Sequence, residues 1–369
     1  MEYVCGNEPV FGFKLNLQTR GSKIFRVSWP EHNPYLPRRY SPAVTISLCA
    51  CASDHNWIIA AMKQIEFHAM GSRILAIVES EAPEAEQTLK CIPGWFEEWE
   101  QALSRFRFDS ELSHLNRSSG VPLKVSELFW EVFQAGCEAE EFTGGLVRPT
   151  MMDALLQAGY DRSFDLMSEI RTVAPAPVLT LPAPSSVIIA NKTTRTILLP
   201  EYVHLDFGGI AKGWAANKTM NRLKMFGSAL VDAGGDISIS DSPPDHEPWA
   251  VGIRDPFQPD THFETLRIER GGVATSGTDY RRWQHGDSFN HHLIDPGTGM
   301  PSRSDVLAAT VIAPNVLQAE AAAKALVILG STAGLDWLEA RPALAGVLVT
   351  QMGEIIYSQR MDEYLWRWK

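Results

Sequence analysis

Two pairs of adjacent glycines, each at the end of an apolar segment, restrict what residues 204–236 (HLDFGGIAKGWAANKTMNRLKMFGSALVDAGGD) can form. The first pair, 208–209, is followed by Lys212 and a segment with helical spacing; the second pair, 234–235, is followed by Asp236. Glycine lets a ligand approach the backbone closely, and a helix start offers free N–H groups to an anion. The pattern predicts a phosphate-bearing ligand held between two strand-to-loop corners. A tight turn with a purely structural role is the alternative that the glycines alone leave open.

Two well-known phosphate motifs do not match this segment. A Walker sequence requires GxxxxGK[ST], whereas Lys212 here precedes Gly213. The dinucleotide fingerprint requires GxGxxG, whereas Gly208 and Gly209 are adjacent. The sequence therefore argues against both a P-loop and a Rossmann-type phosphate loop.

The charge of the chain limits its partners. The 369 residues carry a formal net charge of -11, which argues against a general nucleic-acid binder, because such proteins present a basic surface. An anionic ligand must therefore be met by local positive charge, such as that of Lys212. Charged residues make up 21% and hydrophobic residues 45% of the sequence, the balance of a soluble globular protein, and no apolar run approaches a membrane span.

The first 61 residues differ from the rest, because prolines cluster between residues 30 and 42 and periodicity is weak. We expect an N-terminal extension at 1–61 and one domain at 62–369. The extension either packs on the body or reflects a gene start placed upstream of a true start at Met62. Its segment ending at Cys51 loosely resembles a lipoprotein signal, but it lies too far from the N-terminus. Five cysteines without a CxxC pair favour free thiols in a reducing compartment. Because the sequence shows no convincing export signal, we expect a cytoplasmic protein; a periplasmic or lipoprotein location is the alternative.

The apolar spacing predicts an α+β fold in which strands are interspersed with helices. Helices are expected at 84–106, 126–142 and 318–330. A strand is expected in the second part of 62–80. Further strands are expected at 178–182, 187–190, 228–234, 236–240, 249–255, 264–270 and 272–277.

Residues 272–299 combine side chains suited to acid–base chemistry. Thr275, Ser276 and Gly277 follow a strand, and His291 and His292 precede a short apolar segment and a turn. Neighbouring residues of a strand point to opposite faces, so only one of the two histidines is expected to face a pocket. A histidine there can take a proton from a hydroxyl nucleophile at neutral pH. A structural histidine beside a strand is the alternative.

Taken together, these motifs resemble the ApbE family of FAD:protein FMN transferases. The motifs that carry the resemblance are DxGGxAKG at 206–213, GGD at 234–236, TSG at 275–277 and HHLIDPxTG at 291–299. Weaker matches are SxLSxxN at 110–116, RPT at 148–150 and VGIRDP at 251–256. All occur in the family's order, over about residues 66–350. The resemblance implies an ApbE-like, T-fold-related arrangement of mixed sheets packed with helices.

The resemblance also implies a reaction: FAD is cleaved at its pyrophosphate, FMN is joined through phosphate to a Ser or Thr of a target protein, and AMP leaves. Such a transfer needs a hydroxyl activated by a base and neutralisation of phosphate charge. His292 is the implied base, and Lys212 with the amides between 208 and 213 would line the FAD site. The other implied ligand contacts or orienting residues are Ser110, Asn116, Asp206, Gly208, Gly209, Ala211, Gly235, Asp236, Thr275, Ser276, Gly277, Asp295 and Thr298.

One departure from the family concerns a metal ion. The family carries ADAxAT near its last helix, and the Asp and Thr of this motif hold Mg²⁺; the matching residues here are Glu320 and Lys324. Glu320 still has oxygen ligands to offer, whereas a protonated lysine has no lone pair. At this spacing the two share a helix face and form an ion pair. The ammonium then replaces the cation, or Mg²⁺ still binds through Glu320, backbone carbonyls and the FAD phosphates, or only flavin binding remains. A surface pair without a role is the fourth possibility.

The residues do not separate a transferase from an FAD diphosphatase, in which water takes the place of the acceptor, or from a flavin-binding protein without catalysis. For a transferase, we expect the partner to be an acceptor flavoprotein subunit or domain modified on Ser or Thr. No convincing acceptor motif occurs in this sequence, so we expect modification in trans.

Overall fold

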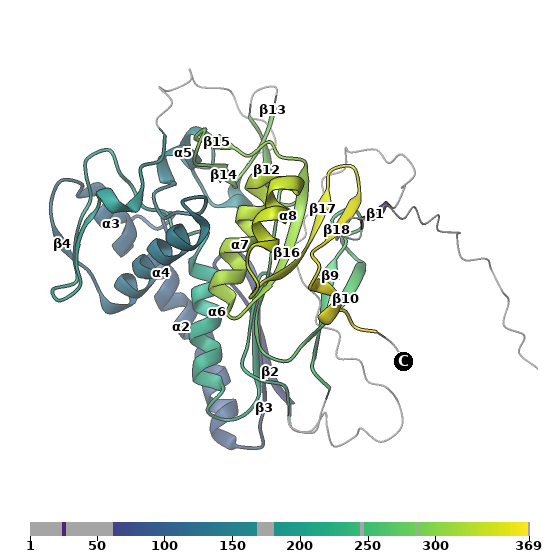
Figure 1. Cartoon of the computed structure of the whole chain (residues 1–369). Helices are drawn as coiled ribbons and strands as arrows, with labels where there is room; N and C mark the ends of the chain where they lie inside the picture. Colours follow the sequence, from purple (N-terminus) through teal and green to yellow (C-terminus); the bar gives the residue numbers. More distant parts are fainter. Residues whose placement is uncertain (1–23, 27–61, 168–180, 244–246, 286–287, 368–369) are drawn as a thin grey trace, which may run out of the picture.

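The computed structural model describes residues 24–26, 62–167, 181–243, 247–285 and 288–367. Its centre is a nine-stranded antiparallel sheet in the order β1-β18-β17-β16-β11-β8-β7-β3-β2 (Figure 1). The strands of this sheet are β1 (Ile24–Arg26), β2 (Met62–Ala69), β3 (Ser72–Glu79), β7 (Ala229–Ala233), β8 (Asp236–Ile239), β11 (Gly271–Gly277), β16 (Val306–Ala313), β17 (Ala345–Thr350) and β18 (Glu354–Tyr357).

Helices cover one face of this sheet and a hairpin covers the other. The covering helices are α2 (Pro83–Leu103), α6 (Ala211–Leu223), α7 (Val316–Leu329) and α8 (Ser331–Glu339), with α4 (Glu127–Thr143) packed outside them. The hairpin consists of β9 (Trp249–Arg254) and β10 (His262–Ile268). The predicted α+β class is confirmed.

Strand β3 is buried on both of its faces. Ile74, Ala76 and Val78 belong to the core under the helices, whereas Leu75 and Ile77 belong to the core under the hairpin. The predicted strand is confirmed and pairs with β2. It has no solvent-facing side because it lies between two cores, as the continuous apolar run ILAIV reflects.

The smaller elements surround the open side of the helical layer. They are α3 (Glu111–Arg117), α5 (Met152–Gln157), the sheet of β4 (Leu123–Lys124), β6 (Thr196–Leu198) and β5 (Ile189–Asn191), the pair β12 (Arg282–His285) and β13 (Ser288–His291), the pair β14 (Ile294–Asp295) and β15 (Met300–Pro301), and the 3₁₀ turns η1 (Phe164–Leu166) and η2 (Ser185–Val187). The 3₁₀ turn η3 (Met361–Glu363) lies on the other side of the sheet, where Met361 belongs to the core under the hairpin.

Local signals explain where the long helices begin and end. Helix α4 ends at Gly144, whose φ of 64° is left-handed and suits glycine. Helix α7 begins after Asn315, whose side chain accepts a hydrogen bond from the Gln318 amide (2.9 Å), and ends at Gly330. All three predicted helices are confirmed, as α2, α4 and α7, within a few residues.

The strands predicted between 228 and 277 are confirmed as β7 to β11, and the one predicted at 187–190 overlaps β5. The strand predicted at 178–182 lies mostly outside the described residues. Of the predicted extension 1–61, only β1 is described, and it pairs with β18 at the edge of the sheet. Cys51 lies outside the described residues, and Met62 opens β2.

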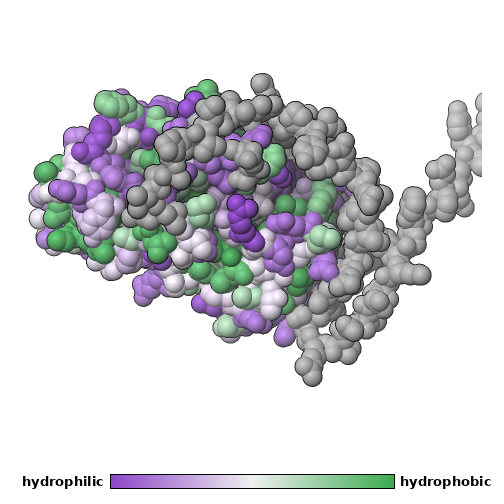
Figure 2. Space-filling model, turned by 90° about the horizontal axis from the view of Figure 1, so that it is seen from above, coloured by the Kyte–Doolittle hydropathy of each residue, from purple (hydrophilic) through white to green (hydrophobic). Residues whose placement is uncertain are grey.

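The surface seen from above has a mixed character. Hydrophobic and hydrophilic side chains are interspersed over the visible coloured part of this face (Figure 2). Among the described residues, every helix is too short or too polar to cross a membrane.

Candidate active site

Two neighbouring cavities meet where the two glycine corners approach helix α7. Both are lined by Gly208, Lys212, Tyr280, Arg281, His292 and Lys324. The structure therefore brings His292 to the same walls as the 208–213 corner, although about eighty residues of sequence separate them. We call these six residues the shared wall.

The larger cavity is mostly apolar. Phe106, Leu155, Tyr160 and Phe164 line it together with Asp206, Gly209 and Ala211. The Asp206 carboxylate accepts a hydrogen bond from Gly208 N (2.9 Å) and forms a buried ion pair with Arg105 Nε (2.8 Å). The Arg105 guanidinium also lies 4.6 Å from the ring centroid of Tyr160. Asp206 thus fixes both the first glycine corner and a cation beneath the aromatic wall.

The smaller cavity is lined by glycines and short polar side chains. They include Gly234 and Gly235 of the β7–β8 turn, Asp236 at the start of β8, and Thr275, Ser276 and Gly277. The last three lie within β11 rather than after a strand as predicted, because β11 continues to Gly277 in pairing with β16. The Thr275 hydroxyl lies 2.8 Å from the Thr310 hydroxyl of β16. Strand pairing between β8 and β11 therefore joins two motifs that are about forty residues apart in the sequence.

Asp232 supports the second glycine corner from inside. Its Oδ1 accepts a hydrogen bond from Gly235 N at 2.7 Å. Burial raises the pKa of Asp232 to about 7, although the Gly235 amide opposes this rise. The neighbouring Asp236 carboxylate adds to the rise. This carboxyl therefore titrates near neutral pH rather than as an exposed aspartate does.

Lys212 lies in the first turn of α6 and is held by carboxylates. Its Nζ forms a short ion pair with Asp236 Oδ2 and lies 3.9 Å from Glu320 Oε1. Burial by itself lowers the pKa of this lysine, but the two carboxylates outweigh burial, and the pKa is raised above its ordinary value. The ammonium is therefore charged at neutral pH.

His292 and His291 have different surroundings. His292 lines both cavities, and its buried Nδ1 has no hydrogen-bond partner among the described residues. Nε2–H of His291 donates to the Ser302 carbonyl oxygen instead (2.8 Å). Burial lowers the pKa of His292 well below 6.5, and the positive charge of Arg281 lowers it further. His292 is thus neutral at neutral pH, which is the form that accepts a proton.

Several amides of the first corner already have acceptors within the protein. Gly208 N donates to Asp206, Ala211 N donates to the Phe207 carbonyl (2.8 Å), and Gly213 N donates to Glu320 Oε2 (3.1 Å). The anion at the start of α6 is therefore a side chain of α7. The ammonium groups of Lys212 and Lys324 face the cavities in place of these three amides.

Glu320 and Lys324 lie one turn apart on α7, and Lys324 Nζ donates to Glu320 Oε1 at 2.9 Å. Both are buried, so the pair is not a surface feature. Burial raises the pKa of the Glu320 carboxyl, and Asp236 adds to the rise, while Lys324 and Lys212 act against it. Glu320 is therefore held between two ammonium groups.

These residues do not fit the Mg²⁺ site that the family resemblance implies. Both oxygens of Glu320 already accept hydrogen bonds, one from Lys324 and one from the Gly213 amide. The second expected ligand is an ammonium, which has no lone pair to donate. Across the residues that the structure describes, no cluster of three or more His, Cys, Asp or Glu side chains is placed to hold a metal ion.

Besides Glu320, four of the predicted site residues line neither cavity. Ser110 caps helix α3 by accepting a hydrogen bond from Ser113 N (3.0 Å), and Asn116 exchanges two hydrogen bonds with the Leu205 backbone, both of 2.8 Å. Asn116 thus fixes the segment that precedes Asp206. Asp295 and Thr298 form the turn between β14 and β15, where Gly297 N donates to Asp295 (2.8 Å).

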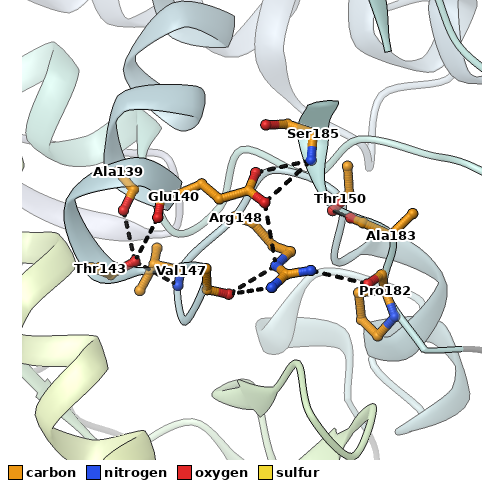
Figure 3. A network of polar contacts seen from close by, with 10 residues as sticks. Ala139, Glu140, Thr143, Val147, Arg148, Thr150, Pro182, Ala183 and Ser185 are labelled. Carbon is orange, nitrogen blue, oxygen red and sulfur yellow. Dashed lines mark hydrogen bonds and ion pairs between the residues drawn. The ribbon is translucent and has the colours of Figure 1, made fainter. Parts of the chain in front are cut away.

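The RPT motif supports the wall of the larger cavity. Arg148 lines this cavity, and its guanidinium donates to the carbonyl oxygens of Gly145 (2.8 Å) and Pro182 (3.1 Å) (Figure 3). The Thr150 hydroxyl forms a short hydrogen bond to the Ala183 carbonyl. Glu140 of α4 accepts from Ser185 N (3.0 Å). This network ties two loops to α4.

The sequence analysis missed several charged residues of the site. Arg281 belongs to the shared wall and donates to the Gly71 carbonyl at 3.2 Å. Arg254 and Asp279, which line the smaller cavity, form an ion pair at 2.7 Å. Burial raises the pKa of Asp279, with Arg254 opposing the rise. Arg254 and Arg281 lie in segments that the analysis singled out, whereas Arg105 has no local signal.

Comparisons with known proteins agree with this architecture. The sequence model of the ApbE family matches residues 70–348. The FAD:protein FMN transferase of Treponema pallidum (strain Nichols) is 29% identical over 277 residues, covering 70% of this chain and 75% of that protein. The FAD:protein FMN transferase of Haemophilus influenzae (strain ATCC 51907 / DSM 11121 / KW20 / Rd) is 25% identical over 319 residues, covering 80% and 88%.

Solved structures show the same fold. The ApbE protein from Thermotoga maritima superimposes with a TM-score of 0.74 at 21% identity, covering 83% of this chain and 100% of that one. The apo form of the flavinyl transferase ApbE of Pseudomonas stutzeri gives 0.70 at 23% identity, covering 82% and 96%. The predicted ApbE-like fold is confirmed. Since the family match spans most of the chain and contains both glycine corners, the shared wall and α7, the chain belongs to the ApbE family.

Proposed function

We propose that this chain is an FAD:protein FMN transferase, which cleaves FAD at its pyrophosphate and attaches FMN to a Ser or Thr hydroxyl of another protein. The observation that carries the proposal is the shared wall. It places two ammonium groups, a guanidinium and a neutral imidazole between two cavities. An apolar, aromatic cavity and a polar, glycine-lined one offer space for the two halves of a dinucleotide on either side of its phosphates.

His292 is the general base of the proposed reaction. An acceptor hydroxyl attacks the phosphorus of the FMN half, the bond from this phosphorus to the bridging oxygen breaks, and AMP leaves with that oxygen. The unprotonated nitrogen of His292 takes the hydroxyl proton, which the lowered pKa of this side chain permits at neutral pH. Phosphoryl transfer depends mainly on position and charge, so Lys212 and Lys324 supply electrostatic stabilisation.

The remaining residues of the two corners hold this arrangement. Asp236 orients Lys212, and Asp206 fixes the Gly208 turn and Arg105. Thr275, Ser276 and Gly277 line the smaller cavity, where short side chains leave room for a ligand. By this account Ser110, Asn116, Asp295 and Thr298 are positioning residues, because their hydrogen bonds connect loops rather than line a cavity.

A labelling assay tests the proposed function. The purified chain is incubated with FAD and a recombinant acceptor domain, the acceptor is separated on a denaturing gel and its flavin fluorescence is recorded, and AMP is quantified by chromatography. We expect fluorescence on the acceptor band and AMP in equal amount, both lost in His292→Asn. Release of FMN and AMP without acceptor labelling would show a diphosphatase instead. FAD binding without AMP release would show a flavin-binding protein.

The acceptor is another polypeptide in this proposal, and the reaction takes place in the cytoplasm. The described cysteines, Cys91 and Cys137, are free thiols, as a reducing compartment favours. Cell fractionation followed by immunodetection of the chain tests this location. Recovery in the periplasmic or membrane fraction would contradict it.

A further inference from the structure

The Glu320–Lys324 pair is oriented with its positive end toward the cavities. Lys324 lines both cavities, whereas Glu320 lies behind it with 1% of its surface exposed and lines neither. An ion pair with this orientation presents a positive charge to an anion in the cavities without adding net charge to the protein. The orientation thus resembles that of a bound cation with its ligand behind it.

Two glycines of the first corner accommodate this pair. A Cβ atom at position 213 would lie 2.4 Å from Glu320 Oε2, and one at position 209 would lie 3.3 Å from Lys324 Cε. A side chain at either position would therefore displace the carboxylate or press on the lysine stem. The glycines predicted to make room for a ligand thus also make room for the Glu320 and Lys324 side chains of α7.

Lys212 by itself does not balance the charge of the phosphates of a dinucleotide. Its ammonium already pairs with Asp236, whereas a pyrophosphate group carries two negative charges. Arg281 of the shared wall, which donates to the neutral Gly71 carbonyl, supplies a further positive charge, and Lys324 adds another where the cavities meet. Lys324 stands at that place, and the residues around it do not fit a divalent metal.

We propose that the Lys324 ammonium, held by Glu320, is the fixed cation for the phosphates of the substrate, and that this chain binds its dinucleotide without a divalent metal. The inference rests on the proposed function, because it assumes FAD as the ligand. A lysine acts here as a point charge that donates charge-assisted hydrogen bonds. Its position is set by α7 rather than by the concentration of an ion in solution.

The test is an FAD titration of the metal-stripped full chain in EDTA and again in excess MgCl₂, followed by flavin fluorescence. We expect Kd values that agree within about twofold, as a charge already in place predicts, and no heat of binding when MgCl₂ alone is titrated by calorimetry. In EDTA, Lys324→Met is expected to weaken FAD binding by about 10- to 100-fold, as loss of a hydrogen bond to a charged group does. Lys324→Arg retains most of the affinity.

Two further variants control for misfolding and for the loss of a lysine outside the site. Glu320→Gln/Lys324→Met removes both charges of the pair, so it folds without an unpaired buried carboxylate and is still expected to bind FAD weakly. Lys90→Met removes the lysine of the exposed Glu86–Lys90 pair on α2 and is expected to bind FAD normally.

Two outcomes would overturn this inference and leave the proposed function intact. One is FAD binding that requires MgCl₂. The other is wild-type affinity for FAD in Lys324→Met and in Glu320→Gln/Lys324→Met. Absence of FAD binding in EDTA and in MgCl₂ alike would overturn the proposed function and the inference together.

Discussion

Two Glu–Lys pairs with the same spacing occur in two helices of this chain, and their surroundings differ. In the Glu86–Lys90 pair of α2 the side chains lie 2.7 Å apart and the lysine and glutamate are 70% and 56% exposed. In the Glu320–Lys324 pair of α7 the distance is 2.9 Å and the exposures are 11% and 2%. The comparison teaches that spacing and distance do not decide the role of an ion pair. Burial does, because water screens an exposed pair and no longer screens a buried one.

Buried and exposed histidines differ in the same way, and here the expected effect of substitution on the rate is largest. His292→Asn removes the proposed base and is expected to lower the rate of FMN transfer by about 10²- to 10⁴-fold. His68→Asn, at an exposed position of β2, is expected to leave the rate unchanged. Transfer is measured as acceptor-bound fluorescence per minute. Equal rates for the two variants would remove His292 from the mechanism.

The pH profile sharpens this prediction. The pKa of His292 lies well below 6.5, so the imidazole stays neutral and competent as a base throughout the neutral range. The rate is therefore expected to be flat from about pH 6.5 upward with respect to this group and to fall only at lower pH, as His292 becomes protonated. An acid limb centred above pH 6.5 would contradict the assignment.

Aspartates inside and outside the site provide the second comparison. Asp232 has a folded-state pKa of about 7 against an ordinary 3.8, so its contribution to stability is present at low pH and is lost as pH rises toward 7. The Asp232→Asn variant does not lose stability in this way, because asparagine does not titrate. The free energy of unfolding of this variant, relative to that of the wild type, is therefore expected to rise by up to about 4 kcal/mol between pH 4 and pH 8. Urea unfolding at several pH values measures it, with Asp109→Asn, at an exposed position, as the control.

The lysines of the two pairs test the comparison directly. Lys324→Met leaves the buried Glu320 without its nearest partner and is expected to lower the free energy of unfolding by about 3 kcal/mol. Lys90→Met on α2 is expected to cause no measurable change, because water solvates both members of that pair. Denaturant unfolding at neutral pH measures both variants. Similar losses would mean that burial does not distinguish the pairs.

The glycines of two helices give the smallest effects, with opposite signs. Gly213→Ala places a Cβ 2.4 Å from Glu320 Oε2 and is expected to destabilise the protein by about 1–3 kcal/mol. Gly94→Ala in α2 has no atom within 4 Å of its new Cβ and is expected to stabilise it by about 0.5–1 kcal/mol, the difference in helix propensity. Thermal unfolding of both variants shows whether each substitution raises or lowers the stability of the protein. Stabilisation by Gly213→Ala would show that α7 yields to the added methyl group.

Most helices and strands could be predicted from the sequence, because the patterns that specify them lie within each element. Helices α2, α4 and α7 follow from apolar spacing and from short capping signals such as Asn315 and Gly144. The strands β7 to β11 follow from short β-rich runs between turns. The burial of β3 on both faces did not follow, since it depends on the β9–β10 hairpin packing against the far side of the sheet.

The sequence by itself determined the chemical groups of the site: a lysine after a glycine pair, a histidine before a turn, and a glutamate and a lysine at metal-ligand positions of the family. Only the tertiary structure decided that Lys212, Asp236, His292, Glu320 and Lys324 meet, and that the last pair is buried with its positive end toward two cavities. Local patterns report spacing along one element. Contacts between distant elements, and the exclusion of water that gives a charge its strength, arise when the sheet and helices pack together.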